Sequence, residues 1–426
     1  MEMSEIPSRT ARSAGETGPT GLNERIEILD ILRGFAILGI LVVNFEGYGF
    51  STFFGMGITD RWPGFGDHFA ESLIVFFATG KFNIIFTFLF GLGFALQMQR
   101  AEKQGQSIPR RYSRRLLGLL CIGLAHKLLI WAGDILVAYA LMGFVLLLFR
   151  VAKERTLLVC SLLLYGAALL PWELSQIRNT FRANSQPAPG EQLRDASQGL
   201  ALQKTEQEVI RVYAHGSFRE LMAVRYAEAI RGFRLGYNSF AHVLSLFLLG
   251  LYAGKKRIFE NLNSNRRLFS RLLVWGPTIG VSAELALHFL YWRGLPVWCG
   301  MLRPILFGVG TCALSAGYVA VLVKLTNVPQ AGVFLGALAK VGRMALTNYV
   351  LQSIVCTFIF YNFGLQLYGR IGPMVGLELT AVIYVMEVWL SGWWLKRARY
   401  GPLEWVLRSI TYRHFQPMWM PGSAHT

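Results

Sequence analysis

Long apolar runs alternate with short basic loops along most of this chain. Ten runs are roughly 20 residues long, the length that crosses the hydrocarbon core of a membrane as an α-helix. They cover residues 28–48, 81–98, 114–132, 134–150, 155–173, 238–254, 270–291, 297–323, 341–360 and 373–394. The runs are rich in leucine and lack the two-residue alternation of outer-membrane barrel strands. The pattern therefore predicts an all-α fold, a polytopic membrane helix bundle of about ten transmembrane helices.

The remaining segments divide the chain into five regions. Residues 1–27 form a polar tail that lacks the apolar core of a signal peptide and is expected to be flexible. Residues 28–173 make an N-terminal membrane bundle, and residues 238–395 make a C-terminal one. Residues 174–237 form a long loop between them, and residues 396–426 form a second tail. The second half of the loop reads as interrupted amphipathic helix, either a lid over the membrane core or a loop packed on its surface, with an apolar face of Val209, Tyr213, Leu221 and Tyr226.

Basic residues gather in four segments, after the second, fourth, sixth and tenth runs. If the chain crosses the membrane ten times, all four lie on one side, which the excess of Lys and Arg marks as cytoplasmic. We therefore expect both termini in the cytoplasm and the loop 174–237 on the opposite side. One missed or extra span would break this agreement. The basic clusters consist of Arg100, Lys103, Arg110, Arg111, Arg114, Arg115, Arg150, Lys153, Arg155, Lys255, Lys256, Arg257, Arg266, Arg267, Lys396, Arg397 and Arg399.

Composition agrees with a membrane protein. Of 426 residues, 53% are hydrophobic and only 16% are charged, whereas soluble domains carry about 25% charged residues. The net charge of +17 would suggest nucleic acid in a soluble protein, but the basic loops explain it here. We expect the lipid bilayer as partner and no nucleic acid. The sequence contains no Walker motif, which disfavours an ATP-driven pump. The five cysteines lie in or beside apolar runs without metal-ligand or redox spacing, so we expect neither a metal site nor a disulfide framework.

Four stretches carry a resemblance to a known family. They are RIEILDILRGFA (25–36) leading into GILVVN (39–44); GKF (80–82) with FGLG (90–93); His126 with WAGDIL (131–136), Tyr139 and Ala140; and GRMALTNY (342–349) with GPLEW (401–405). In this order and spacing they resemble the YeiB-like proteins of the bacterial inner membrane, whose C-terminal region is a domain of unknown function. The resemblance implies a multi-pass protein of the bacterial inner (plasma) membrane.

The first four spans are also similar to transmembrane acyltransferases, such as lysosomal heparan-glucosaminide acetyltransferase and bacterial enzymes that acylate surface sugars. That similarity implies transfer of an acyl group from acyl-CoA to an acceptor at or across the membrane. The chain departs from many of the sugar acylases at one position, where they have a histidine near the end of the first helix and this chain has Asn44.

Ionisable groups are costly inside hydrocarbon and tend to be functional there. On the expected topology, several lie in the outer half of the bundle, which predicts a polar cavity open to the outside. His126 is the candidate general base, because a histidine titrates near neutral pH, and Asp134 could orient it. The structural alternatives are a histidine bonded to a carbonyl and an aspartate that caps a helix. The candidate substrate-binding residues are Asn44, Lys81, Glu284, His288 and Asn348.

Arg33, near the inner end of the first span, is the candidate for binding acyl-CoA. Its guanidinium can meet phosphate with two parallel hydrogen bonds, although an ion pair with Asp30, three residues earlier, is the alternative. Two functions remain open. One is an acyltransferase with acyl-CoA as cosubstrate, no tightly bound cofactor, and a small-molecule or glycan acceptor that is exported or on the cell surface. The other is a transporter or carrier of a small polar or amphipathic solute. A homodimer is one candidate assembly.

Overall fold

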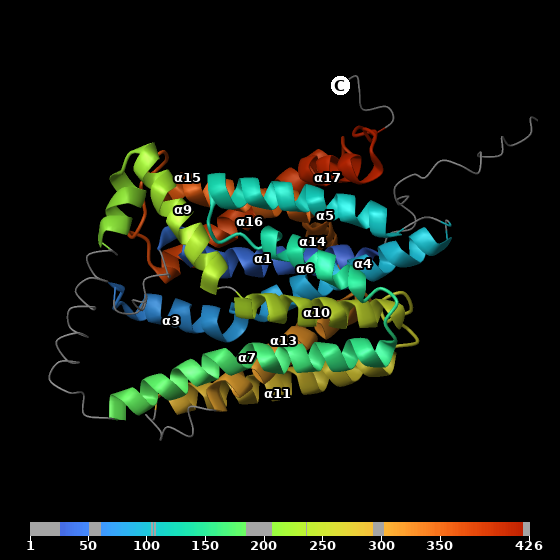
Figure 1. Cartoon of the computed structure of the whole chain (residues 1–426), viewed down its shortest axis with the longest axis horizontal. Helices are drawn as coiled ribbons and strands as arrows, with labels where there is room; N and C mark the ends of the chain where they lie inside the picture. Colours follow the sequence, from blue (N-terminus) through green and yellow to red (C-terminus); the bar gives the residue numbers. More distant parts are fainter. Residues whose placement is uncertain are drawn as a thin grey trace, which may run out of the picture.

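The computed structural model describes residues 26–50, 61–103, 105, 108–184, 207–235, 237–292 and 302–420. The N-terminal tail up to residue 25, residues 185–206 of the long loop and the first residues of the predicted span 297–323 lie outside these ranges. The regular elements of the described residues are helices, and the β contact found among them is an isolated bridge between Ala398 and Trp419. The predicted all-α class is confirmed (Figure 1).

Helices account for every apolar run that the sequence marked. The first half of the chain forms α1 (Glu27–Gly49), α3 (Phe65–Leu73), the π-helix η3 (Ile74–Ala78), α4 (Lys81–Lys103), α5 (Ile108–Ala125), the π-helix η4 (His126–Ile130), α6 (Leu136–Leu148) and α7 (Glu154–Asn184). The second half forms α9 (Phe218–Leu235), α10 (Tyr237–Lys255), α11 (Arg266–Trp292), α13 (Leu302–Leu325), the 3₁₀-helix η5 (Pro329–Ala331), α14 (Gly332–Arg343), α15 (Ala345–Phe360), α16 (Pro373–Leu395) and α17 (Pro402–Tyr412).

Not every helix is a full membrane span by length and composition. Among the described residues, five helical segments qualify, namely Glu27–Gly49, Phe65–Lys103, Arg266–Leu290, Leu302–Leu325 and Pro373–Leu395. A sixth is obtained if η5–α14 and α15, which meet at a bend of 83°, are counted together. The helix α6 and the segment Phe240–Lys255 are apolar but shorter. The membrane bundle is therefore supported, and ten crossings remain a prediction.

The helix α1 runs through the centre of the bundle, where it packs against α4, α14, α15 and α16 (Figure 1). Its crossing with α14 depends on two glycines. A Cβ atom on Gly34 would lie 1.9 Å from the carbonyl oxygen of Leu338, and one on Gly342 would lie 1.8 Å from that of Asp30. No side chain fits at such distances, so the two backbones touch, as small residues allow between membrane helices. Since α4 also packs on α10, the N- and C-terminal halves form one bundle.

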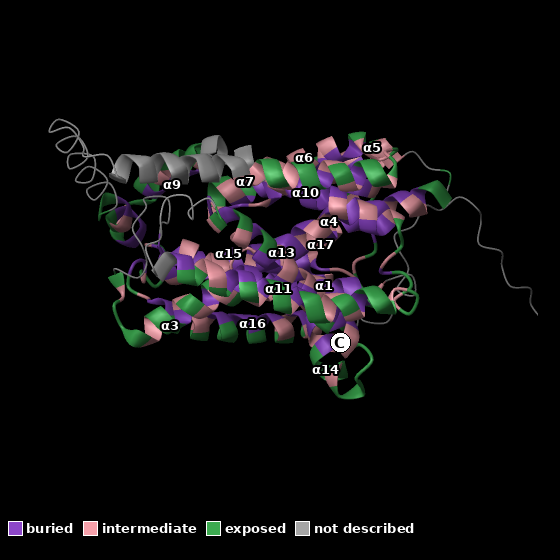
Figure 2. Cartoon of the chain, turned by 90° about the horizontal axis from the view of Figure 1, so that it is seen from below, coloured by how far each residue is buried: buried purple, intermediate pink, exposed green. Residues whose placement is uncertain are grey.

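The outward faces of the helices are apolar. On α16, for example, Val382, Val385 and Trp389 are 64%, 68% and 68% exposed, and exposed positions run along the outer side of this helix (Figure 2). A soluble monomer rarely presents so large a continuous apolar surface. These faces are suited to contact lipid, in agreement with the membrane location expected from the sequence.

The basic segments gather at one end of the bundle, as predicted. Lys255 donates from Nζ to the carbonyl oxygens of Arg150 and Ala152 at 2.9 and 2.8 Å, which ties two of the basic loops together. Arg114 donates from Nε to the carbonyl oxygen of Thr411 at 3.0 Å. This bond ties the basic segment after the second run to α17, the helix that follows the last basic segment. Which compartment this end faces remains a prediction, so we call it the basic end.

The loop between the two halves contains a short helix, residues 207–215, followed by α9. Val209, Tyr213 and Leu221 are buried, as predicted, but Tyr226 is 61% exposed and that prediction is wrong. The two helices pack at the end of the bundle opposite the basic end, beside the C-terminal end of α15 (Figure 1).

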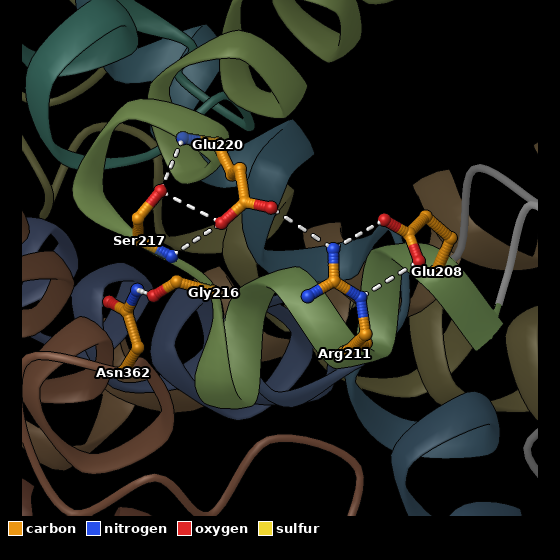
Figure 3. Close-up of polar contacts among 6 residues, drawn as sticks. All are labelled: Glu208, Arg211, Gly216, Ser217, Glu220 and Asn362. Carbon is orange, nitrogen blue, oxygen red and sulfur yellow. Dashed lines mark hydrogen bonds and ion pairs between the residues drawn. The ribbon is translucent and has the colours of Figure 1, made fainter.

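A capping box starts α9 (Figure 3). The carboxylate of Glu220 accepts from the backbone N–H and the hydroxyl of Ser217 at 2.7 and 2.8 Å, and the Ser217 hydroxyl accepts from the N–H of Glu220 at 3.3 Å. Arg211 of the preceding helix bridges Glu220 and Glu208. Asn362, just beyond α15, donates to the carbonyl that precedes Ser217. These contacts fix the junction between the two helices and dock it on the bundle.

Candidate functional site

A buried histidine–aspartate pair lies at the turn between α5 and α6. The helix α5 continues into the π-helix η4, which begins at His126, and the chain reverses over residues 131–135 before α6. Nδ1 of His126 lies 2.9 Å from Oδ1 of Asp134. The other oxygen of Asp134 accepts from the N–H of Val137 at 2.8 Å, so this carboxylate also caps α6. His126 and Asp134 are 1% and 9% exposed.

The hydrogen bonds around this pair fit one tautomer of the imidazole. With Asp134 as a carboxylate, which can only accept, Nδ1 of His126 is the donor. In the neutral ring, Nε2 then carries the free lone pair. Within the described part of the chain, Nε2 is buried and has no hydrogen-bond partner. The pair therefore has the arrangement of an oriented general base, with the proton-accepting nitrogen unoccupied.

Tyr349 connects this pair to the rest of the site. Its ring centroid lies 5.2 Å from that of His126, and its hydroxyl accepts from the N–H of Ile135 at 3.3 Å. Tyr349 is 1% exposed to solvent, but it lines the internal cavity described next. The ring of Tyr349 therefore separates the cavity from His126.

The cavity has a volume of about 260 Å³ and lies among α1, α4, α5, α6, α14, α15 and α17. One water molecule needs only about 10–15 Å³ by a comparable measure, so the cavity can hold a substantial part of a ligand. Five arginines line it, with two carboxylates, which leaves an excess of three positive charges. The charged lining residues are Asp30, Arg33, Arg100, Arg115, Arg343, Glu404 and Arg408. Toward the turn after η4, the lining changes to aromatic and apolar side chains, including Phe86, Phe90, Leu136, Tyr139 and Tyr349.

The four sequence motifs meet around this cavity. Arg33 and Arg343 are each adjacent to one of the two glycines at which α1 and α14 cross, so that crossing delivers both guanidinium groups to one wall. The GPLEW stretch supplies Glu404. Its carboxylate accepts from the N–H groups of Leu346 and Thr347 at 2.7 and 3.1 Å and from the Thr347 hydroxyl at 2.6 Å. It therefore caps the positive N-terminus of α15.

A second buried pair lies elsewhere in the bundle. Nζ of Lys81, the first residue of α4, is 2.6 Å from Oε1 of Glu284 on α11. Lys81 also donates to the carbonyl oxygen of Val75 at 3.0 Å. The side chains of Lys81 and Glu284 are 0% and 3% exposed. The structure thus brings together two of the predicted substrate-binding residues, but as a closed ion pair that does not line the cavity.

The other predicted substrate-binding residues do not join either pair. Asn348 is fully buried and donates to the carbonyl oxygen of Val341 and to the hydroxyl of Ser391, which ties α15 to α14 and α16. Asn44 is half-buried and does not line the cavity, and His288 is exposed although it lies one helical turn from Glu284. The described residues therefore do not show one cavity shared by all these groups, and a cavity open to the outside stays a prediction. The cavity that the structure shows lies toward the basic end.

Arg33 forms the expected ion pair, and its binding of acyl-CoA stays a prediction. Its Nη1 lies 3.0 Å from Oδ1 of Asp30, and the guanidinium also lines the cavity. The sequence did not identify Arg100, Arg115 and Arg408 as site residues, and it placed Arg343 only on a polar stripe that faces the bundle interior. Arg100 and Arg115 were counted as basic-loop residues, and nothing in their spacing separates a ligand-binding arginine from one that orients the chain.

Among the residues that the structure describes, no three His, Cys, Asp or Glu side chains are grouped so as to hold a metal ion.

Comparison with known proteins places this bundle in a family. Residues 253–414 match the family model described as protein of unknown function DUF418. The chain is 35% identical over 420 residues to the uncharacterised protein YxaH of Bacillus subtilis, covering 94% of this chain and 97% of that protein. It is 30% identical over 418 residues to the uncharacterised protein YeiB of Escherichia coli, covering 92% and 98%. An uncharacterised 39.9 kDa protein of Bacillus acidopullulyticus is also 30% identical, over 413 residues. The chain therefore belongs to the YeiB-like DUF418 family.

Proposed function

We propose that this protein is a membrane acyltransferase that takes its acyl group from acyl-CoA. The observation that carries the proposal is one cavity with five arginines at one end and, at the other, a tyrosine that packs on a buried histidine–aspartate pair. Arginine is suited to phosphate, because its planar fork offers two parallel donors. A donor with several phosphates at one end and a reactive carbonyl at the other matches the order of these features.

The chemistry assigned to the site is a transfer between a thioester and a hydroxyl. Nε2 of His126 accepts the proton of the acceptor hydroxyl, and the oxygen attacks the thioester carbonyl. The new C–O bond forms, the C–S bond breaks, and the proton passes to the departing sulfur. Asp134 holds the ring in the required tautomer and stabilises the imidazolium. Since His126 does not itself line the cavity, Tyr349 must turn aside before a thioester can reach it.

The proposal includes an orientation, with the basic end in the cytoplasm, where acyl-CoA is present. The excess of Lys and Arg at that end supports it. The acceptor would then approach from the opposite side, as a small molecule or a glycan. The proposed location is the bacterial inner membrane, with both termini in the cytoplasm.

Binding of CoA to the purified full-length protein tests the donor. Arg33→Lys keeps the charge beside Asp30 but removes the two-donor fork, and Arg115→Gln removes one positive charge from the cavity. Each should weaken CoA binding roughly 10-fold or more, the value of one charge-assisted hydrogen bond. Arg271→Gln is the matched control, because Arg271 is exposed on α11 and does not line the cavity. Unchanged affinity in both cavity variants, measured by titration calorimetry, would remove CoA from the proposal.

A solute carrier is the second candidate, and the ion pair of Lys81 and Glu284 favours it. Charged groups buried between membrane helices often mark substrate or proton pathways. A flux of solute into proteoliposomes that Glu284→Gln abolishes, together with the absence of acyl transfer in the unmodified protein, would replace the enzyme with a carrier.

A further inference from the structure

The turn after His126 lies close to the end of the bundle opposite the basic end. Trp131 packs on Tyr48 with ring centroids 4.1 Å apart, and its Nε1 donates to the carbonyl oxygen of Gly47 at 3.3 Å. Gly47 and Tyr48 are among the last residues of α1. The turn therefore lies beside this end of α1, where the segment 207–235 packs on the bundle.

The helix α9 packs against the π-helix η4 and places Arg225 beside it. Nη1 of Arg225 donates to the carbonyl oxygen of Leu129, in the same π-helix as His126, at 2.7 Å. The guanidinium lies over the ring of Tyr361, 4.9 Å from its centroid. Arg225 is only 2% exposed. The segment between the two halves thus supplies an arginine that contacts Leu129, three residues after His126.

One edge of this guanidinium is unused. Within the described part of the chain, Nε and Nη2 of Arg225 are buried and have no hydrogen-bond partner. Arg225 also takes part in none of the ion pairs found among the described residues. Nε and Nη2 form the side of the fork that meets a carboxylate or phosphate with two parallel bonds. The guanidinium is also hydrogen-bonded to the side chain of Tyr361, but these contacts with Leu129 and Tyr361 leave Nε and Nη2 without a hydrogen bond among the described residues.

The neighbouring carboxylate does not fill the edge. Glu228, one turn further along α9, is buried and accepts from the hydroxyl of Tyr213. Tyr213 belongs to the preceding helix, so this bond joins the two helices of the segment 207–235.

We propose that Arg225 binds an oxyanion of the acceptor, a carboxylate or a phosphate group, on the side of His126 opposite the arginine cavity. The inference rests on the proposed function, since it names the class of acceptor that the same histidine would serve. The acceptor would be an anionic molecule carrying a hydroxyl within reach of His126. Because Arg225 is almost fully buried, the segment 207–235 has to move away from η4 when the acceptor binds.

The test measures anion binding by itself, apart from acyl transfer. Inorganic phosphate and acetate are titrated separately into the full-length protein, in a background of Arg33→Lys with Arg115→Gln that weakens the arginine cavity. Arg225→Lys keeps a donor for Leu129 but cannot offer two parallel bonds. The matched control is Arg219→Lys, an exposed position on the same helix.

We expect one saturable site, weakened about 10- to 100-fold by Arg225→Lys and unchanged by Arg219→Lys. Preference for phosphate over acetate would identify a phosphate-bearing acceptor, and the reverse a carboxylate. Unaltered binding in Arg225→Lys at an unaltered melting temperature would overturn the site, as would the absence of saturable binding of either anion. If acyl-CoA is not the donor, the unmodified protein will not bind CoA. The phosphate and acetate titrations can still be interpreted in that case.

Discussion

Two substitutions of His126 can separate a catalytic histidine from a structural one. In His126→Asn, the side-chain amide nitrogen occupies nearly the position of Nδ1 and can still donate to Asp134, but nothing replaces Nε2. In His126→Ala, both the bond to Asp134 and the base are lost. If His126 is the general base, the two variants should be equally inactive and unequally stable.

The structure gives the expected loss of rate and of stability in each variant. Loss of a positioned base lowers the rate by about 10²–10⁴, and this applies to both variants. His126→Ala also leaves one oxygen of the buried Asp134 carboxylate without its 2.9 Å partner, a loss of about 1–3 kcal/mol. The vacated ring adds a cavity cost of similar size. His126→Asn retains the hydrogen bond and part of the volume, so it should lose less than about half as much stability.

The assay is release of the CoA thiol from an acyl-CoA in the presence of an anionic hydroxyl acceptor, alongside thermal unfolding in detergent. Asp134→Asn should reproduce part of the rate defect, because the amide no longer enforces the Nδ1–H tautomer. A His126→Asn variant that turns over at the normal rate would refute the base assignment, whatever its stability. A His126→Ala variant that melts early while its folded fraction works normally would leave only a structural role.

Two further outcomes follow from the rest of the molecule. In a background whose native cysteines are replaced, a cysteine at Ser264 should be protected from an impermeant thiol reagent in intact cells, and one at Arg219 should be labelled; the reverse pattern would invert the proposed orientation. The hydrogen bonds from Ser217 and Arg211 lower the pKa of Glu220 to about 2 from its ordinary 4.5, so their stabilisation of α9 is fully present above pH 4.5 and lost as the pH falls toward 2. Hydrogen exchange in the first turn of α9 should therefore be slower than in Glu220→Gln at neutral pH, and the difference should shrink as the pH falls through 2. A difference that stays the same between neutral pH and pH 2 would contradict this.

The sequence was sufficient for the helices because their signal is local. A run of apolar residues of the right length is a helix in a membrane wherever its neighbours lie, since the backbone must satisfy its own hydrogen bonds there. The pairing of His126 with Asp134 was also within reach, because the two residues are close in sequence across a short turn. Arg33 could be identified because it stands beside an apolar run, where a charge is conspicuous.

The remainder of the site depends on contacts that are distant in sequence. Arg343 reaches the cavity because Gly342 crosses Gly34, and no local pattern pairs those two glycines. Arg225 lies in a segment whose sequence predicts an amphipathic helix but not its contact with η4. Lys81 and Glu284 pair with each other and not with His126, because residues at one depth in a bundle can face different neighbours.

The turn between η4 and α6 is the feature that makes a two-sided reaction possible. The helix α6 has 13 residues, about 20 Å at 1.5 Å per residue, against a hydrocarbon core of about 30 Å. The turn before it is buried in the bundle, with the arginine cavity reaching Tyr349 on one side and α9 packed on the other. A histidine at the end of a full-length span would face only one compartment. At this turn, the proposed base can meet a donor that arrives along the arginine cavity and an acceptor held by Arg225, without either crossing the whole membrane. A carrier would need its solute to pass the turn entirely, so labelled acyl groups delivered across the bilayer while CoA stays behind would distinguish the two.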